Sequence, residues 1–156
     1  DADGLNAFRG KQKLLGKLGA RAVLTPHPGE AGRLSRDPVP RDDTGRKRFA
    51  LAFAKRHGVV LVLKGHRTVV ASPDGKVYVN RTGNPGLATG GSGDVLTGIV
   101  AAFLAQGLNP FAAARCAVYI HGLAGDLAVK NYGEISLVPT DVLHSLPRVF
   151  LSLLGR

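Results

Sequence analysis

The 156-residue chain has no methionine and no tryptophan, and its only cysteine is Cys116. One cysteine excludes an internal disulfide, and its place in an apolar helical pattern predicts a buried, unreactive thiol. No apolar run reaches the ~18–20 residues of a membrane-spanning helix, and no signal peptide opens the chain. We therefore expect a cytoplasmic protein with no membrane partner. Because the first residue is Asp1 and methionine is absent, we interpret the chain as a fragment, or as one whose N-terminal part is not included.

Acidic residues are also scarce, with 11 Asp and Glu against 21 Lys and Arg, for a formal net charge of +10. Such a charge is typical of nucleic-acid binding proteins. However, the Lys and Arg residues are scattered, no long basic block exists, and aromatic residues make up only 6% of the chain. We therefore predict no nucleic-acid partner, while a small anionic ligand such as a nucleotide is compatible with the charge.

Glycine, in contrast, is concentrated in residues 83–94, where five of the twelve residues are Gly, and an apolar helix is predicted to follow. Missing side chains let backbone N–H groups approach phosphate oxygens, and the first N–H groups of a helix have no partner within it. An ordinary helix cap at Ser92 or Asp94 is the alternative, but the length of the run favours an anion site. Asp94, in the first turn, can act on a reacting hydroxyl beside a bound phosphate.

Two familiar phosphate-binding motifs are excluded. The chain has no G-x-x-x-x-G-K-[ST] sequence, so this stretch is not a P-loop. Leu96 stands where the dinucleotide-binding fingerprint requires a glycine, so the stretch is not that Rossmann turn either.

Apolar runs alternate with helical segments, which predicts an α/β fold. A strand at 22–25, a helix from Asp42 to His57 and a strand at 59–63 form a βαβ unit, so this part of the sheet is expected to be parallel. Strands at 68–72 and 76–80, joined by Pro73-Asp74-Gly75, predict an antiparallel hairpin. The other expected elements are the end of a strand entering a loop at 1–6, and helices at 7–18, from 28 to about 34, at 95–106, at 110–130 and at 141–154.

Two polar segments follow the predicted parallel strands, and open α/β sheets bind ligands at the carboxyl ends of such strands. A lone His is usually structural, but His27 is held between two prolines on the expected ligand edge, which makes it a candidate ligand contact. Lys64 can reach a phosphate, and Gly65 lets the backbone approach a ligand; a basic corner of a hairpin is the alternative. His121 lies on an apolar helical pattern and is predicted to be a satisfied core histidine.

Three of these segments together resemble the ADP-dependent NAD(P)H-hydrate dehydratases of the ribokinase-like superfamily. They are Thr25–Glu30 (TPHPGE), Lys64–Thr68 (KGHRT) and Asn84–Gly98 (NPGLATGGSGDVLTG). Asp1–Asn6 (DADGLN) is similar to the DADALN loop of the family, and the resemblance continues through residues 121–126 to the last helix. It implies an α/β fold of the ribokinase-like three-layer α/β/α type, with a mostly parallel sheet, an antiparallel hairpin and the N-terminal part missing. Residues 1–156 would be a single partial domain.

The resemblance also implies a reaction, the repair of hydrated NADH and NADPH (NADHX and NADPHX). ADP would phosphorylate the hydroxyl of the hydrated ring, and loss of phosphate would restore the double bond, with AMP and phosphate released. Mg²⁺ is expected beside the phosphates, although the sequence has no dedicated cluster of carboxylates and only Glu30 as a candidate. A homo-oligomer and fusion to an epimerase domain are further expectations.

The family's functional residues carry over by position. Asp94 would be the catalytic base or orienting group, and would also contact the hydrated dinucleotide together with His27 and Asn6. Backbone N–H groups of Gly91, Ser92 and Gly93 would stabilise the transferring phosphoryl group. The adenine nucleotide would be held by Lys64, Gly65, His66, Arg67, Thr68 and Gly93.

Two other functions are compatible with the same residues. A small-molecule kinase of the superfamily, acting on a vitamin precursor or a sugar, would use identical chemistry at the glycine-rich loop. A non-catalytic nucleotide-binding remnant or an inactive fragment is the second alternative. The segments 25–30 and 84–86 favour the dehydratase over the kinase, and intact Gly91–Asp94 favours a working site over a remnant.

Overall fold

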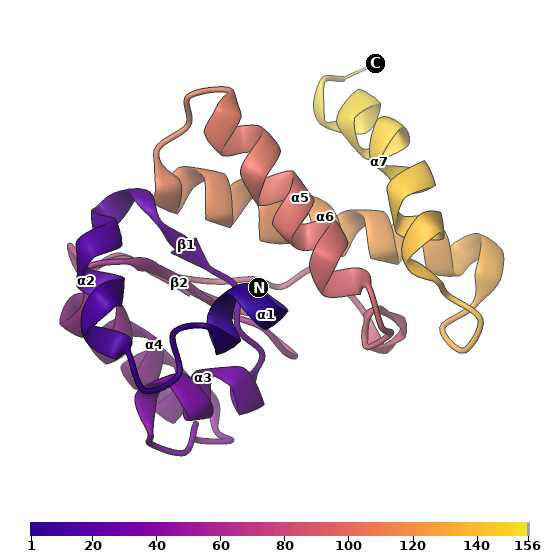
Figure 1. Ribbon diagram of the computed structural model, residues 1–156. Coiled ribbons are helices and arrows are strands. Elements are labelled where there is room, and N and C mark those ends of the chain that lie inside the picture. Colours follow the sequence, from indigo (N-terminus) through magenta and orange to yellow (C-terminus); the bar gives the residue numbers. More distant parts are fainter. Residues whose placement is uncertain (156) are drawn as a thin grey trace.

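The computed structural model describes residues 1–155, and its centre is one four-stranded sheet (Figure 1). The strand order is β1-β2-β3-β4. β1 pairs with β2 in parallel, whereas the pairs β2–β3 and β3–β4 are antiparallel, so the sheet within these residues is mixed. The bounds of the strands are Val23–Leu24, Val60–Leu63, Val69–Ala71 and Val77–Val79. The predicted parallel unit and hairpin are thereby confirmed.

Seven α-helices accompany the sheet within residues 1–155. In chain order they are α1 (Ala2–Asn6), α2 (Leu15–Leu18), α3 (Pro28–Ser35), α4 (Asp43–His57), α5 (Ser92–Ala105), α6 (Pro110–Tyr132) and α7 (Pro139–Leu153). Short 3₁₀ turns lie at Gln12–Leu14, Gly19–Arg21 and Pro85–Leu87.

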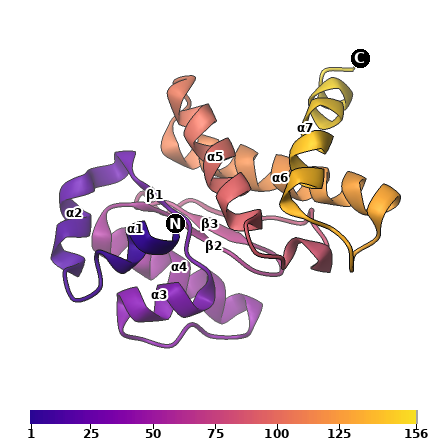
Figure 2. The same cartoon turned by 45° about the vertical axis from the view of Figure 1, so that its right-hand side comes forward.

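Helices cover both faces of the sheet, as Figure 2 shows, because successive side chains of a strand point to opposite faces. From β2, Leu61 and Leu63 pack with α4, α3 and the N-terminal segment. The alternate residues Val60 and Val62 pack against α5 and α6. All four side chains are buried, so β2 lies at the centre of three layers, as the resemblance implies. α7 lies farther out and joins α6 in a third apolar cluster.

Two predictions for the N-terminal segment are wrong. Residues 1–6 contain the short helix α1 rather than the end of a strand. The helix expected at 7–18 is interrupted, because Gly10 has a φ of +77°, a left-handed conformation that cannot continue a right-handed helix. Only α2 and the turn before it remain helical. Cys116 is half-buried rather than buried.

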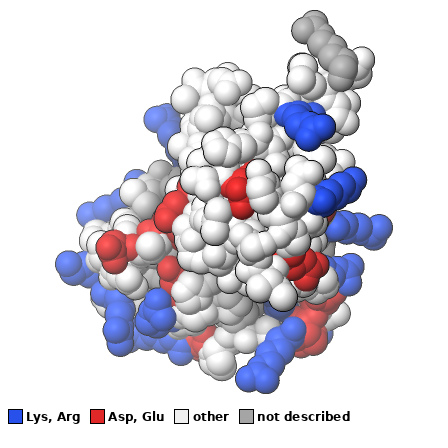
Figure 3. Space-filling view, turned by 90° about the vertical axis from the view of Figure 1, so that its right-hand side faces the viewer, with Lys and Arg blue, Asp and Glu red and all other residues white. Residues whose placement is uncertain are grey.

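Three observations bear on possible partners and on modification. No helix within residues 1–155 combines the length and apolar character that crossing a bilayer requires. On the face shown in Figure 3, basic side chains lie mostly near the rim and much of the area is uncharged. The side chain of Asn80, which begins the formal glycosylation sequence Asn80-Arg81-Thr82, is buried and donates to the carbonyl of Val118 over 3.0 Å.

Candidate active site

A cavity of about 810 Å³ opens where β2, the start of α5 and the loop after β4 meet. The residues that line it come from distant parts of the chain: His27, 64–68, 80–85, 87–90, Ser92, Gly93, Leu96, Val118, His121 and Gly122. The segment 64–68 and three residues of the glycine-rich loop, Gly90, Ser92 and Gly93, therefore face one space. This juxtaposition follows from the packing of Val60 and Val62 of β2 against the apolar side of α5.

The first turn of α5 has the geometry of an anion site. Gly91 is the N-cap residue, with a φ of +89° that favours glycine, and no side chain caps the helix. Within residues 1–155, the N–H groups of Gly91 and Gly93 make no backbone hydrogen bond, whereas Ser92 N–H donates to Thr89 C=O over 3.3 Å. Two of the three predicted donors are thus free, and of these two residues Gly93 lines the cavity.

Lys64 brings a positive charge to this helix terminus. Its Nζ lies 2.6 Å from Asp1 Oδ1 and 4.0 Å from Glu30 Oε2. Burial lowers the pKa of Lys64, and the carboxylates of Glu30 and Asp94 oppose that shift. A Cβ on Gly93 would lie 2.8 Å from Lys64 Nζ and 2.9 Å from Asp1 Oδ2, so only glycine lets the ammonium group approach the backbone this closely.

Arg46 on α4 fixes the backbone of the segment 64–68 from behind. Its side chain is buried and donates to the carbonyl oxygens of Leu63, Lys64 and His66. Gly65 has a φ of +137°, and a Cβ there would lie 3.0 Å from Arg46 Nη2. The guanidinium group therefore holds the turn from which Lys64 and its neighbours face the cavity. Arg67 in the same turn forms an ion pair with Asp43 at the start of α4.

The loop 82–87 rests directly on α6. A Cβ on Gly122 would lie 2.1 Å from Thr82 Oγ1, and one on Gly125 would lie 2.8 Å from the side chain of Leu87. Asp126, one residue farther along α6, accepts from the N–H of Gly83 over 2.9 Å and from the side chain of Asn84 over 3.0 Å. Small residues on α6 and one carboxylate thus position the glycine-rich loop.

Comparison with known proteins identifies the family. A family model described as NAD(P)H-hydrate dehydratase matches residues 1–148. The chain belongs to this family. A bifunctional NAD(P)H-hydrate repair enzyme from Moorella thermoacetica is 47% identical over 153 residues, which are 98% of this chain and 29% of the relative.

Solved structures agree with the family and the fold. An ADP/ATP-dependent NAD(P)H-hydrate dehydratase from Bacillus subtilis, co-crystallised with ATP and Mg²⁺, gives a TM-score of 0.78 at 39% identity, over 83% of this chain and 47% of that one. A ribokinase-like superfamily protein from Enterococcus faecalis gives a TM-score of 0.72 at 33% identity, over 92% of this chain and 50% of that one. The ribokinase-like fold is therefore confirmed, and the chain spans half or less of the length of these proteins.

The residues assigned from the family resemblance fall into two groups in space. His27 and the segment 64–68 line the cavity with Ser92 and Gly93. Asp94 is exposed and lies just beyond Gly93, near enough to Lys64 to affect its pKa. Asn6 does not line this cavity and instead borders a second one.

His27 and Glu30 also stabilise the start of α3. The Nδ1 of His27 accepts from the N–H groups of Gly29 and Glu30, while Glu30 Oε2 accepts from the N–H of His27 over 2.8 Å. This reciprocal pair caps α3. Glu30 is buried and already bonded, which argues against it as a ready Mg²⁺ ligand. No group of three or more His, Cys, Asp or Glu residues within 1–155 is arranged to hold a metal ion.

Sequence reasoning missed several residues that build this site. Asp1 pairs with Lys64, Arg46 holds the turn behind the cavity, and His121 contacts Ser92 with its Nε2 3.2 Å from the hydroxyl. No local pattern marks Arg46, which lies in an ordinary basic helix. For His121 and Asp126, the glycines between them are a local signal of close packing, because they stand inside a helix where glycine is otherwise unfavourable.

Proposed function

We propose that this chain carries the nucleotide site and phosphoryl-transfer centre of an enzyme that dehydrates NADHX and NADPHX at the expense of ADP. One observation carries the proposal: the free N–H group of Gly93 lies beside Lys64, and the carboxylate of Asp94 follows in the same first turn of α5. Donors and a cation stabilise charge on a transferring phosphoryl group, while a carboxylate can orient a hydroxyl or accept its proton.

The reaction balances in two steps. The hydroxyl oxygen of the hydrated ring bonds to the β-phosphorus of ADP, its proton passes to Asp94, and AMP leaves. The carbon–oxygen bond then breaks with phosphate as the leaving group, and loss of a proton from the neighbouring carbon restores the ring double bond. Phosphorylation is needed because hydroxide is a poor leaving group and phosphate is a good one.

Within this scheme, the segment 64–68 binds the adenine nucleotide and His27 contacts the hydrated dinucleotide. Mg²⁺ usually takes one or two protein carboxylates and completes its shell with phosphate oxygens and water. Glu30 is buried and already accepts a hydrogen bond from His27, so phosphate oxygens and water would supply most of the ligands. When bound, the ion would neutralise charge on the nucleotide phosphates.

The test is the absorbance of the nicotinamide chromophore. The whole protein is mixed with NADH hydrate, Mg²⁺ and either ADP or ATP. Recovery of the dihydronicotinamide band, with AMP or ADP released in equal amount, would establish the activity and name the phosphoryl donor. A stable phosphorylated product without band recovery would instead indicate a kinase of the ribokinase-like superfamily.

Several expectations from the sequence remain predictions. They are the single partial domain, an oligomer of identical chains, fusion to an epimerase domain, a cytoplasmic location and the lack of a nucleic-acid partner. The description of the Moorella relative as bifunctional supports a second domain in the whole protein.

A further inference from the structure

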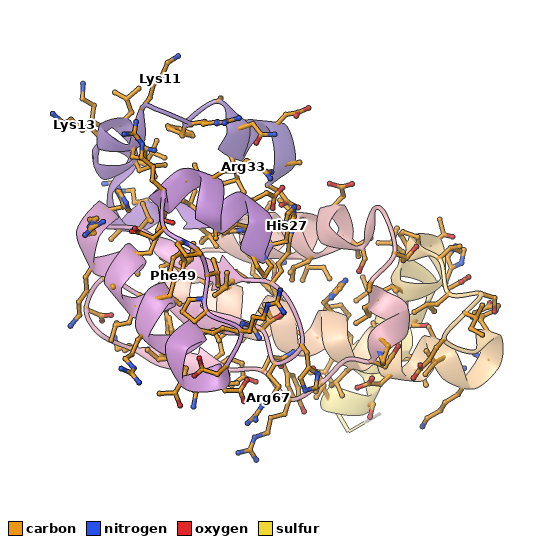
Figure 4. All side chains as sticks on the ribbon, turned by 90° about the horizontal axis from the view of Figure 1, so that it is seen from below. Lys11, Lys13, His27, Arg33, Phe49 and Arg67 are labelled. Carbon is orange, nitrogen blue, oxygen red and sulfur yellow. The ribbon has the colours of Figure 1, made fainter. Side chains whose placement is uncertain are left out.

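A second cavity, of about 790 Å³, lies between the N-terminal segment and α3. It is lined by Arg9, Arg33 and Arg36, by the amides Asn6 and Gln12, and by two glycines. None of these residues is acidic. In Figure 4, Arg33 points from α3 toward the N-terminal segment, and His27 lies at the other end of the same helix.

The three arginines have no charged partner in the described part of the chain. None takes part in an ion pair, and none of their side chains donates a hydrogen bond to the protein. The side-chain nitrogen of Gln12 is buried and has no hydrogen-bond partner either. All three arginines are exposed, so water screens their mutual repulsion, but no acidic residue among those that line the cavity neutralises them. A phosphate in the cavity would supply the missing negative charge.

This cavity is close to the reaction centre. A Cβ on Gly29 would lie 2.8 Å from His27 Cε1 and 3.7 Å from Arg33 Nη1, so the imidazole and the guanidinium flank the same glycine. His27 lines the first cavity and Arg33 the second. α1 connects the two cavities in the same way. Asp1 at its start pairs with Lys64, which lines the first cavity, and Asn6 at its end borders the second. At 1.5 Å per helical residue, the backbone distance from His27 to Arg33, and from Asp1 to Asn6, is only about 8–9 Å.

We propose that Arg9, Arg33 and Arg36 bind a phosphate group of the hydrated dinucleotide while its nicotinamide end reacts at Asp94. The inference rests on the proposed function, because it concerns the same substrate. A dinucleotide carries its pyrophosphate one ribose away from the nicotinamide ring, and NADPHX has a further phosphate on the adenosine ribose. Guanidinium groups bind phosphate oxygens in a bidentate manner, which suits either group.

The test uses the variants Arg33→Gln and Arg36→Gln in the whole protein. Arg41→Gln is the matched control, because Arg41 is exposed and lies outside both cavities. We expect KM for the hydrated dinucleotide to rise roughly tenfold or more in the two test variants, with kcat and KM for ADP unchanged. A rise for both NADHX and NADPHX indicates the pyrophosphate, and a rise for NADPHX alone indicates the ribose phosphate.

Unchanged KM for both substrates in folded variants would overturn the inference. If the wild-type protein lacks dehydratase activity, the proposed function fails, and calorimetric titration with NAD⁺ and NADP⁺ then tests the cavity by itself. Weaker dinucleotide binding by Arg33→Gln than by Arg41→Gln would support the phosphate site. Equal binding, or no binding by the wild type, would refute it.

Discussion

His121 on α6 and Ser92 at the start of α5 are joined by a contact of 3.2 Å between Nε2 and Oγ, and both side chains are buried. Burial lowers the pKa of His121 to about 4, so the imidazole is neutral at pH 7. The predicted core histidine is confirmed as buried, but its partner is a residue of the predicted anion site. α6 therefore supports the first turn of α5 through a polar contact as well as through packing.

The burial of His121 makes stability depend on pH. In the unfolded chain the pKa of His121 returns to about 6.5, whereas the folded chain resists protonation until about pH 4. The unfolded state therefore binds more protons between these values, and stability is full above pH 6.5 and falls as the pH drops toward 4. The loss should reach roughly 3 kcal/mol, measured by urea denaturation across this range.

Burial also lowers the pKa of His57, which adds to the loss in the same direction. The variant His121→Gln should therefore have a flatter pH dependence than the wild type, although not a level one. Exposed His144 provides the control, and His144→Gln should keep the wild-type slope. Equal slopes for wild type and His121→Gln would contradict the assignment.

Replacement of Asp94 by Asn should abolish most of the proposed dehydratase activity while ADP still binds. The amide keeps the size of the side chain but cannot accept the proton of the reacting hydroxyl. A loss of about 10²–10⁴-fold in kcat is typical when a general base is removed. Steady-state kinetics and calorimetry with ADP measure the two effects. Asp37→Asn, a change of equal charge in an exposed loop, should leave both values unaltered.

Arg46→Gln should weaken ADP binding and lower stability together. The substitution removes the donors that hold the carbonyl oxygens of Leu63, Lys64 and His66. Hydrogen bonds to a charged group suggest a loss of about 2 kcal/mol in the free energy of unfolding. Exposed Arg48 on the same helix is the control, since Arg48→Gln removes the same charge. If ADP affinity is the same in both variants, Arg46 does not position the nucleotide segment.

Gly122→Ala should destabilise the protein although alanine favours helices. The new methyl group would meet Thr82 Oγ1 at 2.1 Å and the backbone carbon of Thr82 at 2.7 Å, which displaces the glycine-rich loop. Overpacking of this kind costs about 1–3 kcal/mol. Gly98→Ala on α5 meets nothing within 4 Å and should instead stabilise by up to about 1 kcal/mol. Thermal denaturation of the two variants gives shifts of opposite sign if this packing is correct.

Local sequence patterns were sufficient for much of the fold. The apolar run at 59–63 predicted β2, Asp42 and Gly58 marked the two ends of α4, and Pro73-Asp74-Gly75 located the hairpin turn. These signals depend on neighbouring residues and are therefore visible along the chain. The composition of residues 7–18 predicts one helix, but Gly10 adopts a left-handed conformation that interrupts it.

The sequence by itself determined the chemistry of the site, since its glycines, Lys64 and Asp94 stand in contiguous segments whose residue types suit phosphate binding. Only the tertiary structure decided how these segments meet. It set Lys64 against Gly93, Arg46 behind the nucleotide segment and Ser92 beside His121, each across 18 or more residues of sequence. It also separated Asn6 from the first cavity and grouped it with three arginines. Such contacts depend on how the layers pack. They join residues far apart in the sequence, so local sequence patterns do not predict them.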